Sequence, residues 1–302
     1  MSSLGELRLT GAGGERVDLR RTLASHGVAT LPPQRLDEET WTLETTLSLG
    51  RGRARTVCVR AGRRGHAAVE LAGDAGARDR GRLLATVRHM LRLDDDLSGF
   101  YAAVADDETL AWVAAAGAGR MLRSPTVFED VVKTVCTTNC SWALTTTMTT
   151  ALVAHLGDAA PDGRRAFPTP EAMAGAEESF YREVVRSGYR APYLRALAAS
   201  VASGEVDLEA LADPELPDDE AAARLLALPG IGPYGAAHVM LTSLGRYSRL
   251  VLDSWTRPTY ARLAGRKAKD ATIERRFRRY RDWAGLAFWL YLTRDWVAEP
   301  EP

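Results

Sequence analysis

The stretch LLALPGIGPYGAAHVMLTSLG, residues 225–245, predicts two helices joined by a very short turn. Acidic residues and helix formers come first and predict a helix over 218–228, and the residues after the turn predict a second helix over 234–244. Pro233 stands in the first turn of this second helix, where proline costs no backbone hydrogen bond. The stretch therefore predicts a pair of helices around a tight hairpin.

The hairpin between these helices is suited to bind an anion. Gly230 and Gly232 flank the apolar Ile231, so the backbone can bend tightly and present consecutive N–H groups at the start of a helix. Ile231 would be the apolar plug that fixes the hairpin on its helices. An ordinary structural corner between two helices is the alternative.

The N-terminal segment, residues 7–71, has the pattern of antiparallel strands. Trp41, Leu43, Leu47 and Leu49 recur at even spacing and are expected on one buried face, and a Gly-Arg turn follows them. Residues 18–27 predict a short helix that Gly27 closes, as glycine often does.

From about residue 79 onward, helical spacing replaces the strand pattern. The acidic cluster 94–96 is expected to cap a helix start, with metal binding as the alternative. The remaining helices are predicted, by number, over 128–156, 169–187, 193–202, 255–264 and 273–294. The fold class is therefore α+β, a small antiparallel sheet domain (1–80) followed by a larger all-helical domain (81–302) with its hairpin at 228–235.

The charge of the chain is unevenly distributed. The net charge is zero, yet residues 221–302 carry 14 Arg and Lys against 7 Asp and Glu. A basic C-terminal third favours a polyanionic partner. An arginine-rich composition is the alternative explanation, since only Lys133, Lys267 and Lys269 are lysines.

Composition favours a cytoplasmic protein that does not enter a membrane. Cys58, Cys136 and Cys140 are too few for a disulfide framework and have no second pair at metal-ligand spacing. The first twenty residues are polar and predict no signal peptide. We expect no metal, no membrane partner and a monomer.

The hairpin, the helix after it and the apolar run 250–252 that ends at Asp253 together resemble the helix–hairpin–helix DNA glycosylase superfamily. The resemblance implies that Asp253 is catalytic and that Gly230, Ile231, Gly232 and Gly235 grip double-stranded DNA beside a damaged base. It leaves room for a monovalent cation at the hairpin and implies no other cofactor.

The resemblance continues upstream and covers residues 91–255. VFEDVVKTVCTTNCSWA resembles the segment whose Asn fills the gap left by a flipped base, which implies this role for Asn139. GYRAPYLRALA resembles the segment whose Tyr wedges the duplex and whose Arg contacts the orphaned base, here Tyr189 and Arg190. The structural alternatives are a helix cap for Asn139, a core aromatic for Tyr189 and a surface ion pair for Arg190. The N-terminal sheet is similar to that of the 3-methyladenine glycosylase II and 8-oxoguanine glycosylase branches.

A carboxylate at Asp253 suits glycosidic cleavage. It would stabilise the positive charge that develops on the sugar and orient the attacking water. A protein that only binds DNA would gain nothing from a carboxylate near the phosphates, because the two repel each other. This comparison favours an enzyme over a non-catalytic DNA-binding protein, which stays the alternative from another class.

Several positions depart from the family pattern. The slot that holds a Schiff-base lysine in strand-cutting members is Tyr234, so we expect no lyase activity. The four-cysteine iron–sulfur signature of another branch is absent, because the last cysteine is Cys140. Leu144 replaces a further arginine that would contact the orphaned base.

Aromatic residues are candidates for the base pocket. Trp142, Tyr234 and Trp255 are expected to line it, because a cationic alkylated purine stacks well on aromatic rings. Trp283 and Trp289 are left open between the pocket and the core. The sequence thus predicts a monofunctional glycosylase that removes an alkylated purine, with an 8-oxoguanine-type glycosylase as the alternative on the same fold.

Overall fold

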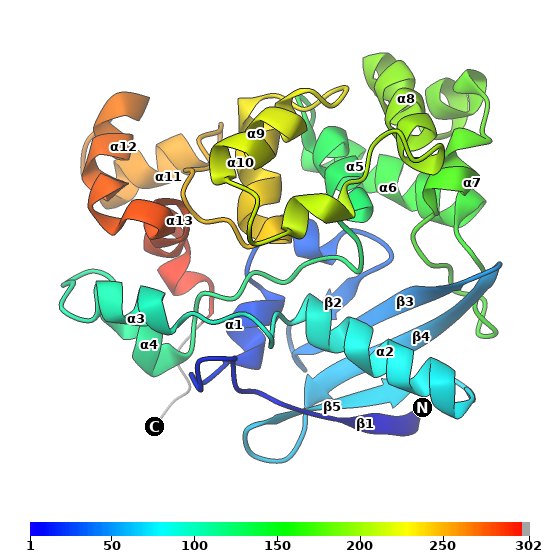
Figure 1. The fold of residues 1–302 in the computed structure, drawn as a ribbon, viewed down its shortest axis with the longest axis horizontal. Helices are drawn as coiled ribbons and strands as arrows, with labels where there is room; N and C mark the ends of the chain where they lie inside the picture. The colour runs from blue at the N-terminus through cyan, green and yellow to red at the C-terminus, as the bar shows by residue number, and fades with distance from the viewer. Residues whose placement is uncertain (298–302) are drawn as a thin grey trace.

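The N-terminal part of the chain forms a five-stranded antiparallel sheet with strand order β1-β5-β4-β3-β2. The computed structural model describes residues 1–297 and places this sheet below the helices in Figure 1. The strands are β1 (Ser2–Arg8), β2 (Arg35–Asp37), β3 (Thr42–Gly50), β4 (Arg53–Ala61) and β5 (His66–Leu71). The predicted antiparallel sheet is confirmed.

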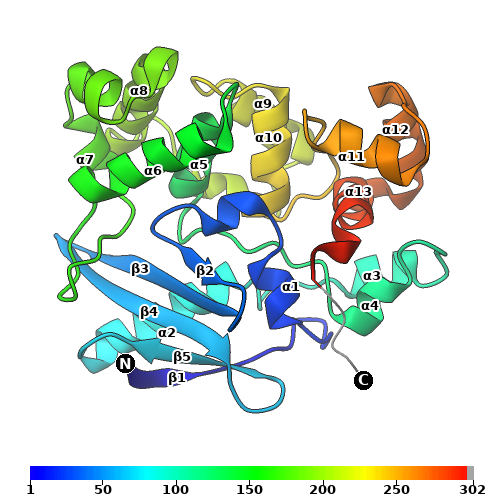
Figure 2. The same ribbon diagram turned by 180° about the vertical axis from the view of Figure 1, so that it is seen from behind.

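Helix α2 (Ala77–Met90) crosses one face of the sheet, and Figure 2 shows the opposite face. Leu43 of β3 pairs with Val59 of β4, and both are buried in one cluster with Leu83 and Val87 of α2. Successive side chains of a strand point to opposite faces, so the alternating apolar residues create this one-sided core.

Two N-terminal predictions are wrong. Trp41 is not on the buried face of β3, because it lies in the turn before the strand with a φ of 51° and is partly exposed. The helix predicted over 18–27 is shorter, since α1 covers only Leu19–Leu23. Gly27 does not close it but begins a short 3-10 helix, η1 (Gly27–Thr30).

The rest of the described chain is helical, which confirms the predicted fold class. The helices are α3 (Ser98–Val104), α4 (Trp112–Ala116), α5 (Val127–Thr137), α6 (Trp142–Leu156), α7 (Pro170–Ala174), α8 (Ala191–Ala202), α9 (Asp218–Leu226), α10 (Pro233–Val239), α11 (Thr256–Leu263), α12 (Asp270–Phe277) and α13 (Ala284–Thr293). Short segments extend or connect them: the π-helical η2 (Phe180–Val184) and η5 (Met240–Leu244), and the 3-10 helices η3 (Gly188–Arg190), η4 (Glu209–Ala212), η6 (Arg278–Trp283) and η7 (Arg294–Trp296).

Three long predicted helices are broken in the structure, and the one predicted over 169–187 separates into α7 and η2 around residues 175–177. The run predicted over 128–156 separates into α5 and α6 at a turn where Asn139 has a φ of 46°. Ser141 starts the second helix, with its Oγ accepting the N–H of Leu144 at 3.3 Å. The run predicted over 273–294 is interrupted at Arg281, whose φ is 51°. Apolar spacing continues across the breaks at Asn139 and Arg281 and therefore did not predict them.

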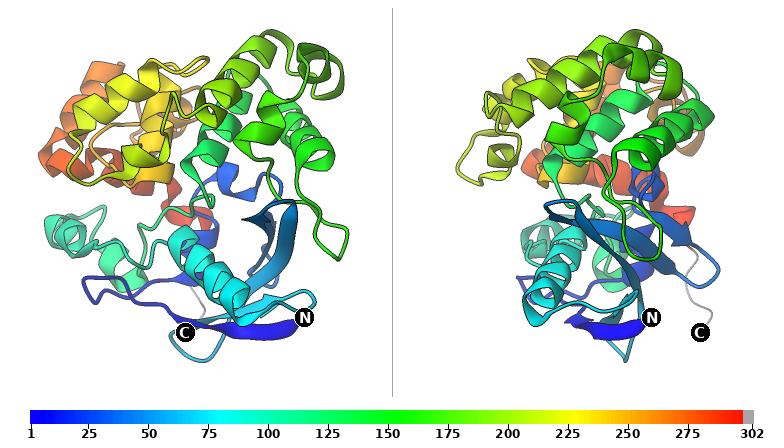
Figure 3. Two further views of the ribbon diagram at one scale, coloured as in Figure 1. Left: turned by 45° about the vertical axis from the view of Figure 1, so that its right-hand side comes forward. Right: turned by 90° about the vertical axis from the view of Figure 1, so that its right-hand side faces the viewer.

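The helical part contains two hydrophobic cores, and the sheet with α2 has a third. One core joins α5–α10, and the other joins α3 and α4 to α11–α13. Figure 3 shows the two helical groups above the sheet, with the α3–α4 pair beside it. Side chains from distant parts of the sequence meet where the three cores adjoin, at the turns near residues 27, 139 and 231.

Two buried arginines tie these cores together. Arg92 donates to Asp95 at 2.8 Å and to the carbonyl of Thr242 at 2.6 Å. Arg120 donates to the carbonyl of Arg92 and to the carboxylate of Glu15. A buried guanidinium without its partners would cost several kcal/mol, so these contacts fix the relative placement of the cores.

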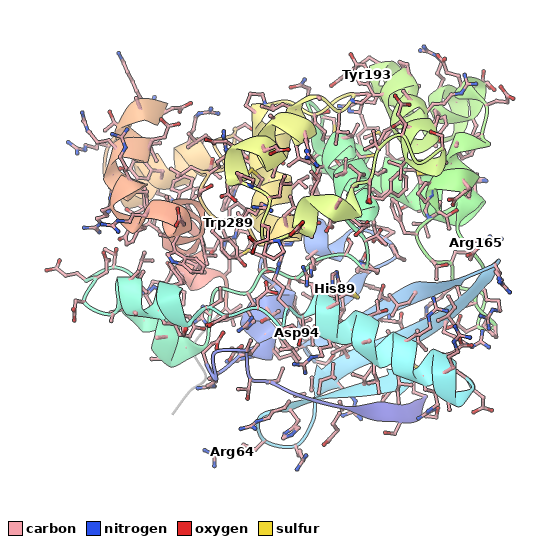
Figure 4. All side chains as sticks on the ribbon, viewed as in Figure 1. Arg64, His89, Asp94, Arg165, Tyr193 and Trp289 are labelled. Atoms are coloured by element: carbon pink, nitrogen blue, oxygen red, sulfur yellow. The ribbon has the colours of Figure 1, made fainter. Side chains whose placement is uncertain are left out.

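The acidic cluster 94–96 makes separate local contacts. Asp94, labelled in Figure 4, pairs with Arg88 at 2.7 Å. Asp96 accepts the N–H of Ser98 at 2.8 Å, at the start of α3. Among the described residues, no group of three or more acidic, His or Cys side chains is arranged to hold a metal ion.

Helix α2 begins at Ala77, close to the domain boundary predicted at residue 80, and its buried face belongs to the sheet core. The division into 1–80 and 81–302 stays a prediction. Within the described part of the chain, no helix combines the length and the apolar character that crossing a bilayer requires.

Candidate active site

A cavity of about 860 Å³ opens where the three cores meet. Its walls come from η1, the turn between α5 and α6, the N-terminal half of α10, and the start of α11. Figure 2 shows these four segments around the upper centre of the molecule. The predicted residues Asn139, Trp142, Tyr189, Tyr234 and Asp253 all line it. The fold thus brings together side chains that are more than 110 positions apart in the sequence.

The hairpin lies at one edge of this cavity. Gly230 has a φ of 81°, and a Cβ there would approach the side chain of Tyr193 to 3.1 Å, so a side chain would be strained. Gly232 and Pro233 are exposed at the start of α10, and a Cβ on Gly232 would meet no atom within 4 Å. The backbone of Gly232 is therefore open to a ligand.

Two hairpin residues that were predicted to contact DNA, Ile231 and Gly235, are buried and help to pack the hairpin against its helices. Ile231 is buried, and its N–H donates to the carbonyl of Leu228 at 3.2 Å, which fits its predicted role as an apolar plug. Gly235 is also buried, and a Cβ there would lie 3.4 Å from the side chains of Ile231 and Thr134. Gly235 thus permits close packing under the hairpin and also lines the cavity, and its contact with DNA stays a prediction.

Asp253 is held at the start of α11. Its Oδ1 accepts the N–H groups of Trp255 at 2.8 Å and Thr256 at 2.6 Å, while its own N–H donates to Thr256 Oγ1 at 2.8 Å. The reciprocal bonds fix the orientation of the carboxyl group at a half-buried position. Oδ2 makes no hydrogen bond with a described residue, so it is available to a ligand in the cavity.

Aromatic rings form much of the cavity wall. Trp255 lies 5.6 Å from the ring of Trp289 and 5.4 Å from that of Trp296, and all three line the cavity. On the opposite side, a Cβ on Gly27 would lie 3.5 Å from the ring of Trp142, which is half exposed. Figure 4 shows Trp289 toward the centre of the molecule, below α10.

The question left open for Trp283 and Trp289 has two different answers. Trp289 lines the cavity and its Nε1 donates to the carbonyl of Ser25 at 2.8 Å. Trp283 does not line it, because its ring packs 5.5 Å from both Phe100 and Tyr247 in a helical core. Trp283 caps the start of α13 and Trp289 lies within it, and six positions along a helix turn the side chain by about 240°, so the two tryptophans face different surroundings.

Two buried histidines, His26 and His238, line the cavity as well, and no motif in the sequence marks either of them. His238 follows Tyr234 by one helical turn, with ring centres 5.8 Å apart. The ring of His26 lies edge-on to it at 5.8 Å. Burial lowers the pKa of His26 to about 4 and that of His238 to about 3, so both imidazoles are neutral at pH 7.

The tautomer of His26 follows from its contacts. Its Nε2 lies 2.6 Å from the carbonyl oxygen of Leu122, which can only accept, so Nε2 carries the proton. Nδ1 is then an acceptor, and it makes no hydrogen bond with a described residue. This side of the cavity therefore carries no positive charge.

The turn between α5 and α6 presents Asn139 beside Tyr189. Asn139 Nδ2 donates to the Tyr189 hydroxyl at 3.3 Å, and half of the Tyr189 side chain is exposed. Both side chains lie at the mouth of the cavity, where neither is a core residue. This placement fits the roles that the resemblance implies for them.

Arg190 is placed differently from the prediction. It is buried, its guanidinium lies 4.5 Å over the Tyr189 ring, and its Nε donates to Thr138 Oγ1 at 3.2 Å. The 3-10 turn η3 folds the side chain inward, so a direct contact with an orphaned base is not available in this conformation. Arg190 instead supports the turn that carries Asn139.

Comparison of the sequence with known protein families agrees with this geometry. Residues 132–283 match the HhH-GPD superfamily of base excision DNA repair proteins. The chain belongs to this superfamily. The family that the hairpin and Asp253 predicted is thereby confirmed.

Relatives of this HhH-GPD chain align over part of their length. The N-glycosylase/DNA lyase OGG1 of Arabidopsis thaliana is 33% identical over 142 residues, which cover 45% of this chain and 38% of the relative. A probable N-glycosylase/DNA lyase of Methanothermobacter thermautotrophicus is 23% identical over 193 residues, covering 57% and 61%. The chain thus spans less than two thirds of both relatives.

Solved structures share the whole HhH-GPD fold of this chain. The 3-methyladenine DNA glycosylase of Archaeoglobus fulgidus has a TM-score of 0.74 at 22% identity, covering 97% of this chain and 99% of its own. The 8-oxoguanine glycosylase/lyase of Clostridium acetobutylicum has a TM-score of 0.72 at 19% identity, covering 94% of both chains. The similar proteins are therefore named for two different lesions.

No lysine lines the cavity of this HhH-GPD protein within the described residues. Tyr234 occupies the wall, and its hydroxyl lies 3.3 Å from Thr137 Oγ1. The lysine nearest in sequence to the cavity turn, Lys133, is buried and donates to Glu129 at 2.6 Å and to Gln34 at 2.5 Å. Its amine is engaged in the link between α5 and the N-terminal segment.

Proposed function

We propose that this protein is a monofunctional DNA glycosylase that hydrolyses the N-glycosidic bond of an alkylated purine flipped out of double-stranded DNA. The observation that carries the proposal is the carboxylate of Asp253, fixed through Oδ1 and with Oδ2 free at an aromatic-walled cavity. Such a carboxylate stabilises an oxocarbenium-like transition state and orients water toward the sugar carbon.

The lining of the cavity supports a cationic alkylated base as the substrate. Trp142, Tyr234 and Trp255 offer ring faces that attract a cation. His26 and His238 are neutral and so do not repel one. A base that already carries a positive charge leaves as a neutral molecule when the bond electrons move onto it, so cleavage requires no acid to protonate it.

The order of events follows from the placement of the groups. Backbone N–H groups at Gly232 would hold a phosphate, and the target base would leave the stack at a cost of a few kcal/mol. Asn139 and Tyr189 would occupy the space it vacates. Water then attacks the sugar carbon beside Asp253 as the glycosidic bond breaks, and the product is an intact abasic strand.

A Schiff-base lyase step is not part of this proposal. That step needs an amine within bonding reach of the sugar carbon, and Tyr234 cannot supply one. A monovalent cation at the hairpin, a monomeric state and a cytoplasmic location also stay predictions.

The proposal is tested with duplexes that carry single lesions, including 3-methyladenine analogues, 7-methylguanine and 8-oxoguanine, followed by alkaline cleavage of abasic sites. Asp253→Asn should lower the single-turnover rate by at least about 100-fold while binding to an abasic-site duplex is retained. Asp282→Asn, at an exposed carboxylate outside the cavity, is the matched control. Wild-type turnover in the Asp253 variant would refute the catalytic assignment, and release of 8-oxoguanine alone would refute the lesion class.

A further inference from the structure

The C-terminal run RRFRRYR, residues 275–281, uses its arginines in two ways. Arg276 is structural, since it lies 4.6 Å over the ring of Tyr291. Arg279 is also engaged, because it pairs with Asp107 at 2.6 Å. Both side chains serve the core of the second helical group, as their partners lie on α13 and on the segment before α4.

Arg278 and Arg281 are different. Both are exposed, and neither side chain makes a hydrogen bond or an ion pair with any residue in the described part of the chain. Arg281 also has a φ of 51° and a ψ of −121°, a backbone conformation that is unfavourable for a residue with a side chain. The surrounding structure therefore holds the backbone of Arg281 in a conformation that costs conformational free energy.

These two arginines line a groove of about 470 Å³ together with Arg249 and Arg257, which we call the arginine groove. The groove and the active-site cavity share four residues, Pro233, Tyr234, Leu252 and Arg257. The groove therefore adjoins the cavity, and Pro233, Tyr234, Ala236 and Ala237 of α10 form part of its lining.

The groove carries a surplus of positive charge. Two acidic residues line it, Asp270 and Glu274, against four arginines. Asp270 is bonded to Arg257 at 2.8 and 2.9 Å, and Arg249 pairs with the almost fully exposed Asp219 at 2.7 Å. Exposed ion pairs of this kind contribute at most about 1 kcal/mol, so a phosphate can compete for these arginines.

We infer that the arginine groove binds the phosphate backbone of the DNA beside the lesion and extends the contact that the hairpin makes. This inference rests on the proposed function, because it takes DNA as the ligand of the neighbouring cavity. Arginine presents several donors that match phosphate oxygens, and the contact would not depend on sequence or damage.

The test compares Arg278→Ala/Arg281→Ala with wild type in fluorescence anisotropy titrations of a labelled duplex over a series of salt concentrations. Each phosphate contact that is lost lowers the slope of log K against log salt by about 0.9, so the double variant should lose about 1.8. Affinity near 0.1 M salt should fall by about tenfold for each arginine, equally for damaged and undamaged duplexes. The single-turnover rate at saturating protein should not change, because neither residue lines the cavity.

Two controls separate this effect from a general loss of charge. Arg8→Ala/Arg64→Ala removes two exposed arginines from the sheet part, and Figure 4 shows Arg64 at the opposite end of the molecule from α10. Its salt slope should equal that of wild type. Arg278→Lys/Arg281→Lys keeps the charge and should keep most of the slope.

The outcomes distinguish the groove from the proposed function. Wild type that binds and processes a lesion duplex, together with an unchanged slope in Arg278→Ala/Arg281→Ala, would refute the groove alone. A loss confined to damaged duplexes would also refute it, because backbone contacts are insensitive to the base. If the wild-type protein bound no duplex, the proposed function itself would fail. Equal thermal midpoints of the variants would establish that each one is folded.

Discussion

Mild acid should destabilise this protein through two histidines at the cavity, His26 and His238. Both are buried and neutral in the folded state, with pKa values lowered to about 4 and about 3 by desolvation. In the unfolded chain an ordinary histidine titrates near 6.5. The unfolded state therefore binds more protons below that value, and the free energy of unfolding decreases as the pH falls.

The magnitude follows from the interval over which only the unfolded state is protonated. Above pH 6.5 the stabilisation is fully present, and each pH unit below it removes about 1.4 kcal/mol per histidine until the folded pKa is reached. At pH 5 each histidine should thus have cost about 2 kcal/mol relative to pH 8. His89, whose pKa is lowered to about 4, adds to the loss in the same direction from a less buried position.

The assay is urea unfolding followed by tryptophan fluorescence at pH 8 and at pH 5. His26→Gln cannot titrate, yet its amide N–H can still donate to the carbonyl of Leu122. The variant should lose about 2 kcal/mol less than wild type between the two pH values, whatever its stability at pH 8. An identical loss in both proteins would refute the claim that burial keeps His26 neutral at the cavity.

Four further outcomes are expected. Gly232→Asp should weaken binding to every duplex in anisotropy titrations at least tenfold, while Gly232→Ala should be nearly neutral because no atom lies within 4 Å of the added Cβ. Tyr189→Ala should slow single-turnover release of a fluorescent reporter base, and a wild-type rate would exclude a wedge. Arg190→Ala should lower stability by about 1–3 kcal/mol in urea unfolding and reduce activity equally for all partner bases, since Arg190 is buried. With Tyr234 in the lysine slot, borohydride should trap no covalent protein–DNA adduct, and a shifted band on a processed substrate would refute the monofunctional mechanism.

The sequence predicted the features that depend on local patterns. The alternation of Leu43, Leu47 and Leu49 depends on neighbours in a strand, and the hairpin depends on Gly230 and its flanking helices. The spacing from the hairpin to Asp253 placed this carboxylate correctly at the cavity, because a single helix and a short segment separate them. These signals are contained within about thirty residues.

The features that depend on distant contacts could not be predicted in this way. Arg190 is buried because the turn at Thr138, more than 50 positions earlier, offers its side chain a hydrogen-bond acceptor. Trp296 and His26 reach the cavity from opposite ends of the chain, and neither belongs to a motif. The break at Asn139 lies within uninterrupted apolar spacing, and only the local capping residues mark it, since Asn139 adopts a positive φ and Ser141 caps α6.

The cavity has a further consequence because its walls belong to three separately packed cores. Residues 26–28 come from the sheet side, Asn139 and Trp142 from one helical group, and Trp289 from the other. The walls touch at single contacts, such as Trp289 with the carbonyl of Ser25 and His26 with His238, so a substitution in one wall acts mainly on the packing of its own core. Changes in lesion preference can therefore accumulate one wall at a time during evolution while the carboxylate at Asp253 stays in place, and laboratory libraries confined to a single wall should retain folded proteins at high frequency.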